Sequence, residues 1–463
     1  MKPESHKLSF WEKAGYGCGD LASVLFWQTI MVYLFFFYTD VFGLTAAAAG
    51  TMMGVSRLLD AFIDVGVGIT ADRTKTRWGK FRPYLLWMSL PLAVAAVVTF
   101  ITPSFGPTGK LIYAYITFIA FMFFYSAINI PYTSLLGVIS SDPNERTSAS
   151  SFKFVGAYLA GIIVSATALP LSRYLGHGQP AKGWPITMTI YASAAVVLFL
   201  ITFLSTRERI QPIAKEKTSI RSDLKDLSRN TPWIILFAVT ILFILFVCIR
   251  LAVTTHYFKY YVGEQHVAFL GKTFGFEWLA SAFNVVGQAF SLIGVLLVPW
   301  FTRVARKKRA VLILLATAVL CTGSFYLFAP GQLLLIFGVQ ILGSLTGGPI
   351  SAVLWAMYAD TADYSEWKTG RRATGLVYSA SIMSNKIGWA LGTFIAGIIL
   401  SAYGFIPDQI QNTNVLRGLK AMMSVIPLVM GTVAFLLLMF LYKLDDDIMK
   451  KIKEELEARR ASA

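Results

Sequence analysis

Two aspartates about one helical turn apart lie inside an apolar stretch of this 463-residue chain. Asp60 and Asp64 fall within the run from Ala46 to Thr70, and Arg57 precedes them by about one turn. A spacing of four residues places both carboxylates on one face of a helix. A carboxylate near the centre of a bilayer costs roughly 2.5–3.5 kcal/mol, so a membrane helix that carries two is expected to use them. We predict a cation site; the alternative is a structural pair neutralised by Arg57.

The composition predicts an all-α integral membrane protein. Apolar residues make up 56% of the chain and charged residues 14%, and the mean hydropathy is +0.61. Apolar runs of about 20 residues, each long enough for a hydrocarbon core of about 30 Å, recur along the whole chain. We predict twelve transmembrane helices. Their approximate centres are Gln28, Asp60, Ala93, Phe121, Gly161, Val197, Phe246, Ser291, Ala318, Ile341, Lys386 and Phe435.

The net charge of +16 has a topological explanation. If the N-terminus is cytoplasmic, most of the Lys and Arg residues fall in segments on the cytoplasmic side, as the positive-inside rule requires. We therefore expect a multi-pass protein of the cell (inner) membrane with both termini cytoplasmic, and no nucleic-acid partner. The sequence contains no P-loop, no HExxH motif and no nucleophile elbow, so we expect neither an enzyme nor any catalytic residue.

The longest internal polar stretch divides the chain into two halves. We predict a six-helix bundle over residues 1–205, a cytoplasmic linker over 206–231, a second six-helix bundle over 232–443 and a cytoplasmic tail over 444–463. Short basic loops recur at corresponding places in the two halves. Duplicated halves are typical of transporters whose substrate site lies near the middle of the membrane.

Several motifs then resemble one family in their order and spacing. The chain is similar to the glycoside-pentoside-hexuronide:cation symporters, the melibiose-permease-like branch of the major facilitator superfamily. The resemblance covers nearly the whole chain and implies two pseudo-symmetric halves of the major facilitator fold. The motifs that carry it are GCGD at 17–20, YTD at 38–40, RLLDAFID at 57–64, DRTKTRWGKFRP at 72–83, NIP at 129–131, ADTADYSEWKTG at 359–370, and Lys386.

The resemblance implies that Asp60 and Asp64 bind the coupling cation, and the predicted cation-binding residues are Asp60, Asp64, Ser126 and Asn129. Two departures from the family pattern bear on the identity of that ion. Ile63 stands where some Na⁺-using members have Asn, and Asn129 stands where the best-known members have Asp. Fewer fixed oxygens weaken a Na⁺ cage more than a protonatable pair, so Na⁺ and H⁺ both remain open. We expect no cofactor, and no metal other than Na⁺ at Asp60 and Asp64.

The resemblance also implies a sugar site. Asp20 matches a family acid that accepts hydrogen bonds from sugar hydroxyls, although it could instead pair helices. Lys153 stands near the place of a family arginine, and Thr133 replaces an aromatic ring, so the sugar itself is not specified. Lys386 could attract the acids of the first half or reach an interface, and Trp355 could stack on a sugar or face lipid. The predicted sugar-binding residues are Asp20, Tyr125, Asn129, Lys153, Trp355 and Lys386.

Charges of both signs gather at the predicted cytoplasmic ends of several helices. We predict that they form an inner gate; the alternative is ordinary solvated charge. The predicted gating residues are Arg57, Asp72, Arg73, Arg77, Arg146, Asp360, Asp363, Arg371 and Arg372.

The resulting expectation is a secondary symporter that couples uptake of a sugar, glycoside, pentoside or hexuronide to Na⁺ or H⁺ by alternating access. We expect it to act in the lipid bilayer as a monomer. Two alternatives remain: a carrier of lysophospholipid-like amphiphiles, and a sugar receptor that does not transport. Converging polar groups such as Asp20, Asn129 and Lys386 favour the sugar.

Overall fold

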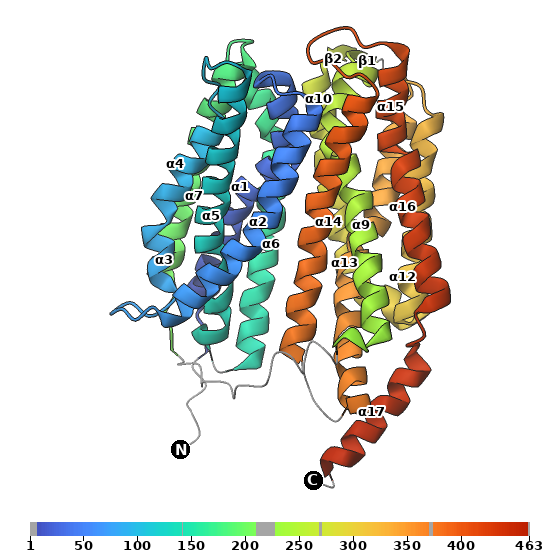
Figure 1. Ribbon diagram of the computed structural model, residues 1–463. Helices are drawn as coiled ribbons and strands as arrows, with labels where there is room; N and C mark the ends of the chain where they lie inside the picture. Colours follow the sequence, from blue (N-terminus) through green and yellow to red (C-terminus); the bar gives the residue numbers. More distant parts are fainter. Residues whose placement is uncertain (1–6, 141, 210–226, 268–270, 370–373, 462–463) are drawn as a thin grey trace. The chain divides into compact units, whose positions relative to one another are not determined.

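A computed structural model describes residues 7–140, 142–209, 227–267, 271–369 and 374–461, most of which are helical (Figure 1). The first part of the chain forms α1 (Phe10–Phe36), the π-helical turn η1 (Phe37–Val41), α2 (Ala46–Arg73), α3 (Arg82–Trp87), α4 (Ser89–Thr99), α5 (Pro107–Ile139), α6 (Pro143–Leu175) and α7 (Pro180–Ser205). The rest forms α9 (Thr231–His256), η2 (Tyr257–Val262), β1 (Gln265–Val267), β2 (Lys272–Phe274), α10 (Phe276–Leu296), α11 (Val298–Ala305), α12 (Lys307–Ser324), η4 (Phe325–Leu327), α13 (Leu333–Thr369), α14 (Thr374–Ala402), α15 (Thr413–Met423), α16 (Val425–Leu436), η5 (Leu437–Leu441) and α17 (Asp446–Ala461).

The predicted all-α membrane fold is confirmed, apart from one short hairpin. Within the described ranges, ten helical segments are long and apolar enough to cross a membrane. Helix α2 is not among them, because Arg57, Asp60 and Asp64 interrupt its apolar sequence. The third predicted segment is divided at Met88 into α3 and α4. If α2 and the α3–α4 pair are counted as one span each, the ten segments are consistent with twelve spans. The hairpin pairs β1 with β2 in antiparallel register.

The described residues form two compact units. Unit 1 takes its residues from Met1–Ala214, Phe258–Val285 and Thr393–Val415. Unit 2 takes its residues from Lys215–Tyr257, Val286–Gly392 and Leu416–Ala463. Most of the predicted linker at 206–231 lies outside the described residues, and the predicted bundle boundaries stay a prediction.

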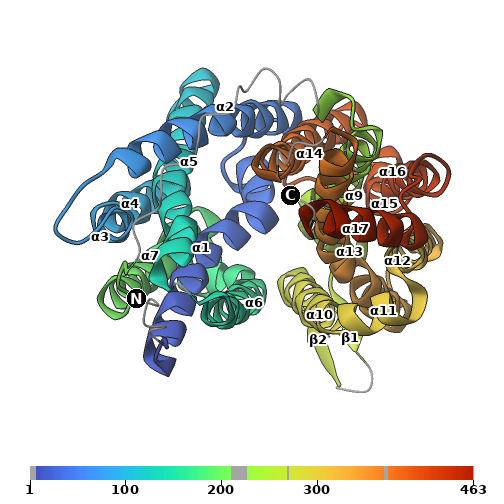
Figure 2. The ribbon, with the colours of Figure 1, turned by 90° about the horizontal axis from the view of Figure 1, so that it is seen from below.

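Close backbone contacts hold the first helices of unit 1 together. Helix α1 packs along α6 and α7, while α2 packs along α5 (Figure 2). A Cβ atom on Gly17 would lie 2.7 Å from the carbonyl oxygen of Phe152, and one on Gly156 would lie 2.4 Å from that of Gly17. Glycine at these positions therefore lets α1 and α6 approach backbone to backbone, a common arrangement in membrane helix pairs.

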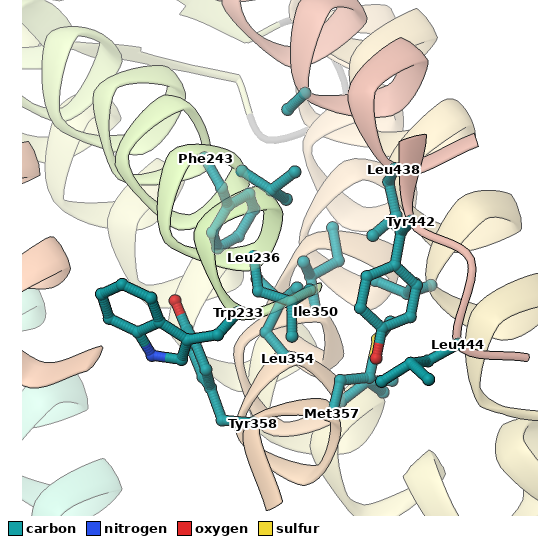
Figure 3. Close-up of a cluster of buried hydrophobic side chains, with 14 of the residues drawn as sticks. Trp233, Leu236, Phe243, Ile350, Leu354, Met357, Tyr358, Leu438, Tyr442 and Leu444 are labelled. Carbon is teal, nitrogen blue, oxygen red and sulfur yellow. The ribbon is translucent and has the colours of Figure 1, made fainter. Parts of the chain in front are cut away.

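Unit 2 has an apolar core centred on α9, α13 and the segment after α16 (Figure 3). Phe243 of α9, Leu354 of α13 and Leu438 of η5 all belong to it. The amphipathic α17 adds apolar side chains from one face to the same cluster, so the tail helix packs as part of unit 2. Those side chains are Met449, Ile452 and Leu456.

Candidate functional site

The two aspartates of α2 share one hydroxyl group from α5. The Ser126 Oγ atom lies 3.0 Å from Asp60 Oδ1 and 2.6 Å from Asp64 Oδ1. Ser126 and Asp60 are buried, and Asp64 is half-buried. The four-residue spacing on α2 directs both carboxylates to the same face, and the packing of α2 along α5 brings Ser126 to them. The structure thus joins three of the four residues predicted for the cation site.

The number of protons in this arrangement limits its chemistry. A serine hydroxyl carries one proton and can donate it to only one acceptor in a linear hydrogen bond. Two ionised carboxylates therefore cannot both be satisfied by donation from Ser126. The second contact becomes favourable when a carboxyl is protonated and donates to Oγ, or when a cation lies among the oxygens. The geometry suits a site that takes up either a proton or a small hard cation.

Arg57 lies within α2 and not at its end. Its side chain is buried; Nη1 donates to Thr393 Oγ1 at 2.6 Å, and Nη2 lies 3.3 Å from Met31 Sδ. A Cβ atom on Gly50, two turns earlier in α2, would lie 2.8 Å from the Cα atom of Gly397. Arg57 therefore links α2 to neighbouring helical segments within unit 1, and its predicted part in an inner gate stays a prediction.

A second charged pair joins α1 to α6. Lys153 Nζ lies 3.8 Å from Asp20 Oδ1, and the Asp20 and Lys153 side chains are 11% and 21% exposed. The same ammonium lies 5.5 Å from the centre of the Tyr132 ring, within the range of a cation–π interaction. Two predicted sugar-binding residues are thus neighbours. Together they offer a carboxylate acceptor, an ammonium donor and an aromatic face.

The GCGD motif explains how Asp20 reaches this position. Tyr16 and Tyr132 stack with ring centres 4.8 Å apart, and each phenol donates to the backbone carbonyl of the other residue. A Cβ atom on Gly19 would lie 2.4 Å from the Tyr132 ring. A side chain at this position would push the ring, and with it α5, away from α1. The glycine therefore keeps the aromatic wall against Asp20.

Tyr125 and Asn129 lie on α5 on either side of Ser126. The Tyr125 ring stacks on Trp27 with centres 5.2 Å apart, and the charges of Asp20, Asp60 and Asp64 all act on its phenol. Tyr125 is thus close enough to Asp20 and to the aspartate pair to feel the charge of both. Asn129 is half-buried one turn after Ser126 and, among the described residues, makes no hydrogen bond to either aspartate. The predicted role of Asn129 in the cation site stays a prediction.

The remaining predicted sugar residues belong to unit 2. Trp355 of α13 stacks on Tyr378 of α14, with ring centres 6.1 Å apart and an angle of 9° between the planes. It also lines a small cavity that Asn385 and Thr240 share. Lys386 is half-buried in α14. The predicted attraction of Lys386 to the acids of the first half stays a prediction.

The gating residues of unit 1 are largely exposed. Asp72 and Arg73 lie at the end of α2, and Arg77 in the following loop stacks on the Trp78 ring with its Cζ atom 4.6 Å from the ring centre. Arg146 is half-buried near the start of α6. These side chains occupy helix ends, as a gate requires, and their movement stays a prediction.

One gating residue of unit 2 forms a close ion pair. Asp360 is buried, and Lys307 Nζ donates to its two carboxylate oxygens at 2.8 and 2.7 Å. Asp363 is half-buried one turn later in α13. Arg371 and Arg372 lie outside the described residues. The lysine partner was missed because the sequence shows only a basic loop at 303–309 and not which member reaches α13.

Glu208, another residue that the sequence prediction missed, holds the basic loop after α2. Its carboxylate accepts hydrogen bonds from the backbone N–H groups of Lys80, Phe81 and Arg82 at 2.8, 2.7 and 2.9 Å. These N–H groups open α3, where a carboxylate is favourable. Gly79 has a φ of +107°, and a Cβ atom there would collide with the Glu208 carboxylate. This contact accounts for the glycine in the DRTKTRWGKFRP motif.

Asp40 of the YTD motif lies in a cluster of hydrogen-bond donors. Asp40 accepts hydrogen bonds from Thr39 Oγ1 at 2.7 Å, from Lys259 Nζ at 2.8 Å and from the Tyr260 phenol. Its side chain is only 1% exposed. Lys259 also pairs with Asp408. Sequence reasoning missed this cluster because its members are separated by up to several hundred residues.

Comparisons with known proteins identify the family. A model of the family described as MFS/sugar transport protein matches residues 15–446. The chain is 35% identical to the isoprimeverose transporter of Lactiplantibacillus pentosus, over 97% of this chain and 92% of that protein. It is 33% identical to the inner membrane symporter YicJ of Escherichia coli strain K12, over 98% of this chain and 96% of that protein.

A solved structure agrees with the fold. The crystal structure of a bacterial homologue of the human lysosomal transporter Spinster matches with a TM-score of 0.67 at 15% identity, over 95% of this chain and 98% of that one. This likeness shows the fold alone. Together with the family model and the full-length relatives, it means that the chain belongs to the MFS/sugar transport protein family, as its resemblance to glycoside-pentoside-hexuronide:cation symporters predicts, and is a transporter and not an enzyme.

Proposed function

We propose that this protein is a secondary symporter that carries a sugar or glycoside together with Na⁺ or H⁺ by alternating access. The observation that carries the proposal is the single Ser126 hydroxyl shared by Asp60 and Asp64. A proton or a cation bound here would offset the repulsion between two carboxylates that lie beside the same hydroxyl. The binding of the coupling ion would thereby fix the relative positions of α2 and α5.

The sugar site would include Asp20, Lys153 and the neighbouring aromatic rings. Asp20 offers oxygen acceptors for sugar hydroxyls, and Lys153 offers N–H donors on the facing helix. Tyr125 lies within the influence of Asp20 as well as of Asp60 and Asp64. It would therefore be a neighbour of both the sugar site and the cation site.

The names of two relatives support the proposed class of cargo and the proposed location in the inner membrane. One is a transporter of isoprimeverose, and the other is an inner membrane symporter. For the present chain we propose the inner membrane, with both termini cytoplasmic and the monomer as the working unit. The Lys307–Asp360 pair and the loop held by Glu208 would then lie on the cytoplasmic side, where an inner gate opens and closes.

The test is uptake by proteoliposomes that contain the purified full-length protein. A panel of glycosides, pentosides and uronides is offered under an imposed Na⁺ gradient or an imposed pH gradient. We expect one of the gradients to drive accumulation of at least one sugar. Asp60→Asn and Asp64→Asn should abolish that gradient-driven accumulation, because each removes an ionisable oxygen donor from the pair.

The matched control is Glu264→Gln, which neutralises an exposed acid of unit 1 outside the membrane helices. It should transport like the unaltered protein. Accumulation that is unchanged in both aspartate variants would exclude this cation site. Ligand binding without uptake or counterflow would indicate a receptor, and uptake of a lysophospholipid instead of a sugar would indicate a lipid carrier.

A further inference from the structure

A short amphipathic helix of unit 2, α11, has no part in the proposed transport. It joins two segments that are long and apolar enough to cross a membrane, α10 and the helix that begins with α12, so it lies at a membrane surface (Figure 2). Val298 and Phe301 of α11 pack against the apolar core of unit 2. Trp300 and Val304 point outward instead, and their exposed fractions are 57% and 68%. One side of α11 therefore covers the protein, and another exposes apolar groups.

Exposed arginines border this apolar side. Arg303, Arg306 and Arg309 follow one another at intervals of three residues, where α11 turns into α12. Arg306 is paired with Asp447 of α17, whose carboxylate oxygen lies 2.7 Å from Nη1. Among the residues that the structure describes, Arg303 and Arg309 form no ion pair. Two positive charges beside the exposed apolar side can therefore bind a negatively charged group from outside the chain.

We propose that the surface formed by Trp300, Arg303, Val304 and Arg309 binds an anionic phospholipid. The guanidinium groups would hold the headgroup phosphate, for which arginine offers a fork of N–H donors. Trp300 and Val304 would lie at the boundary between headgroups and acyl chains, where tryptophan is enriched. A short helix with an apolar side and basic residues beside it is typical of a segment that lies in the membrane interface.

The apolar side favours a lipid over a soluble acidic partner. Such a partner would match the charge of Arg303 and Arg309 but would leave Trp300 and Val304 unexplained. Leu296, the last residue of α10, is also exposed, so the apolar surface of a membrane helix continues onto α11. The inference requires that the chain lies in a membrane, and it does not depend on the sugar or the coupling ion.

A lipid bound here would also restrain the start of α12. Lys307 is the first residue of that helix, and its Nζ atom lies 2.7 Å from Asp360 of α13. Arg303 and Arg309 lie on either side of Lys307 in the sequence. Holding both arginines on one headgroup would keep the first turn of α12, and with it this ion pair, in place.

The experiment is amide hydrogen exchange of the full-length protein in nanodiscs. One set of nanodiscs contains phosphatidylcholine alone, and the other contains equal parts of phosphatidylcholine and phosphatidylglycerol. We expect phosphatidylglycerol to slow the exchange of residues 297–309 at least about fivefold, the effect of one arginine near an anionic membrane surface. In the double variant Arg303→Gln/Arg309→Gln, the slowing should fall below about twofold.

Two further double variants show whether the position and the charge matter. Lys182→Gln/Arg417→Gln removes two positive charges from exposed positions outside α11 and α12, and it should keep the slowing. Arg303→Lys/Arg309→Lys retains both charges but lacks the planar fork. It should keep more of the slowing than the glutamine variant does.

The outcomes distinguish a lipid from a free anion and leave the proposed function aside. Equal exchange of residues 297–309 in the two kinds of nanodisc would overturn the proposal, as would slowing that persists in Arg303→Gln/Arg309→Gln. Slowing by inorganic phosphate in phosphatidylcholine nanodiscs would show an anion site that needs no lipid, and would also overturn it. Because the measurement uses no sugar and no ion gradient, its failure would not affect the proposed symport.

Discussion

At the scale of single residues, coupling would depend on the hydroxyl group of Ser126. Its Oγ atom is within hydrogen-bonding distance of both Asp60 and Asp64. Without a bound ion, two ionised carboxylates beside this hydroxyl repel each other. A bound proton or cation weakens this repulsion, and the Ser126 hydroxyl can then also act as an acceptor or as an ion ligand. The hydroxyl therefore contributes most when the ion is bound.

We predict that Ser126→Ala weakens ion binding without removing transport. A lost hydrogen bond to a charged group costs about 1.5–3 kcal/mol, which corresponds to a roughly ten- to hundredfold higher ion concentration for half-maximal sugar uptake. The measurement is uptake as a function of Na⁺ concentration or pH. Ser126→Thr keeps the hydroxyl and should lie close to the unaltered protein. Equal ion dependence in the alanine variant and the unaltered protein would contradict the assignment.

Individual residues differ in how far the sequence predicts them. Asp60 and Asp64 stand out because a charge is costly in an apolar helix, and this signal needs no partner. Lys153 and Asp20 could be predicted only as separate sugar-binding residues, because their 3.8 Å contact depends on how closely α1 and α6 pack. Glu208 carries no comparable signal. It lies in a polar stretch of the sequence. Its role is recognisable only in the structure, where it accepts hydrogen bonds from the backbone N–H groups at the start of α3.

Among the helices and their connections, the Asp40 cluster joins segments that are remote in sequence. Lys259 of η2 contacts Asp40 of η1 and also Asp408. Asp40 is almost completely buried, so its carboxylate depends on these donors for the hydrogen bonds that water would otherwise supply. The cluster therefore holds the ends of several elements of unit 1 together.

We predict that Lys259→Met destabilises the protein by about 2–3 kcal/mol, because a buried carboxylate loses a charged partner. The measurement is the melting temperature of the purified protein in detergent. Asp40→Asn removes the charge that Lys259 neutralises, so the double variant should lose less stability than the two single variants together. Losses that simply add would mean that the two side chains do not stabilise each other.

The sequence predicts the helices better than their interruptions. Long apolar runs define most of the membrane helices, because burying backbone polar groups in lipid leaves few alternatives to a helix. The break at Met88 and the β1–β2 hairpin have no such signal. Tertiary packing determines where the helix breaks and where the hairpin forms. It also determines that Arg57 of α2 contacts Thr393. The predicted gate lies between these two cases. Its acidic and basic residues can be recognised in the sequence, but an ion pair such as Lys307–Asp360 cannot.

For the whole protein, the proposed symport makes sugar accumulation a function of the membrane potential. If one positive charge crosses with each sugar, a potential of −100 mV supplies about 2.3 kcal/mol per cycle. At about 1.4 kcal/mol for each factor of ten, this corresponds to roughly fiftyfold accumulation of sugar, without any concentration gradient of the ion. A uniporter on the same fold would only equalise the sugar concentrations on the two sides.

We therefore predict that a K⁺ diffusion potential set with valinomycin, at equal Na⁺ and pH on both sides, drives roughly fiftyfold accumulation in proteoliposomes. Asp64→Asn should lose this accumulation, because a pair with one ionisable oxygen donor fewer no longer carries the ion. Sugar exchange without a potential should persist in that variant if Asp20 and Lys153 still bind sugar. An uncharged sugar that only equilibrates at −100 mV in the unaltered protein would show that no cation crosses with it, and Asp60 and Asp64 would then have a structural role in α2.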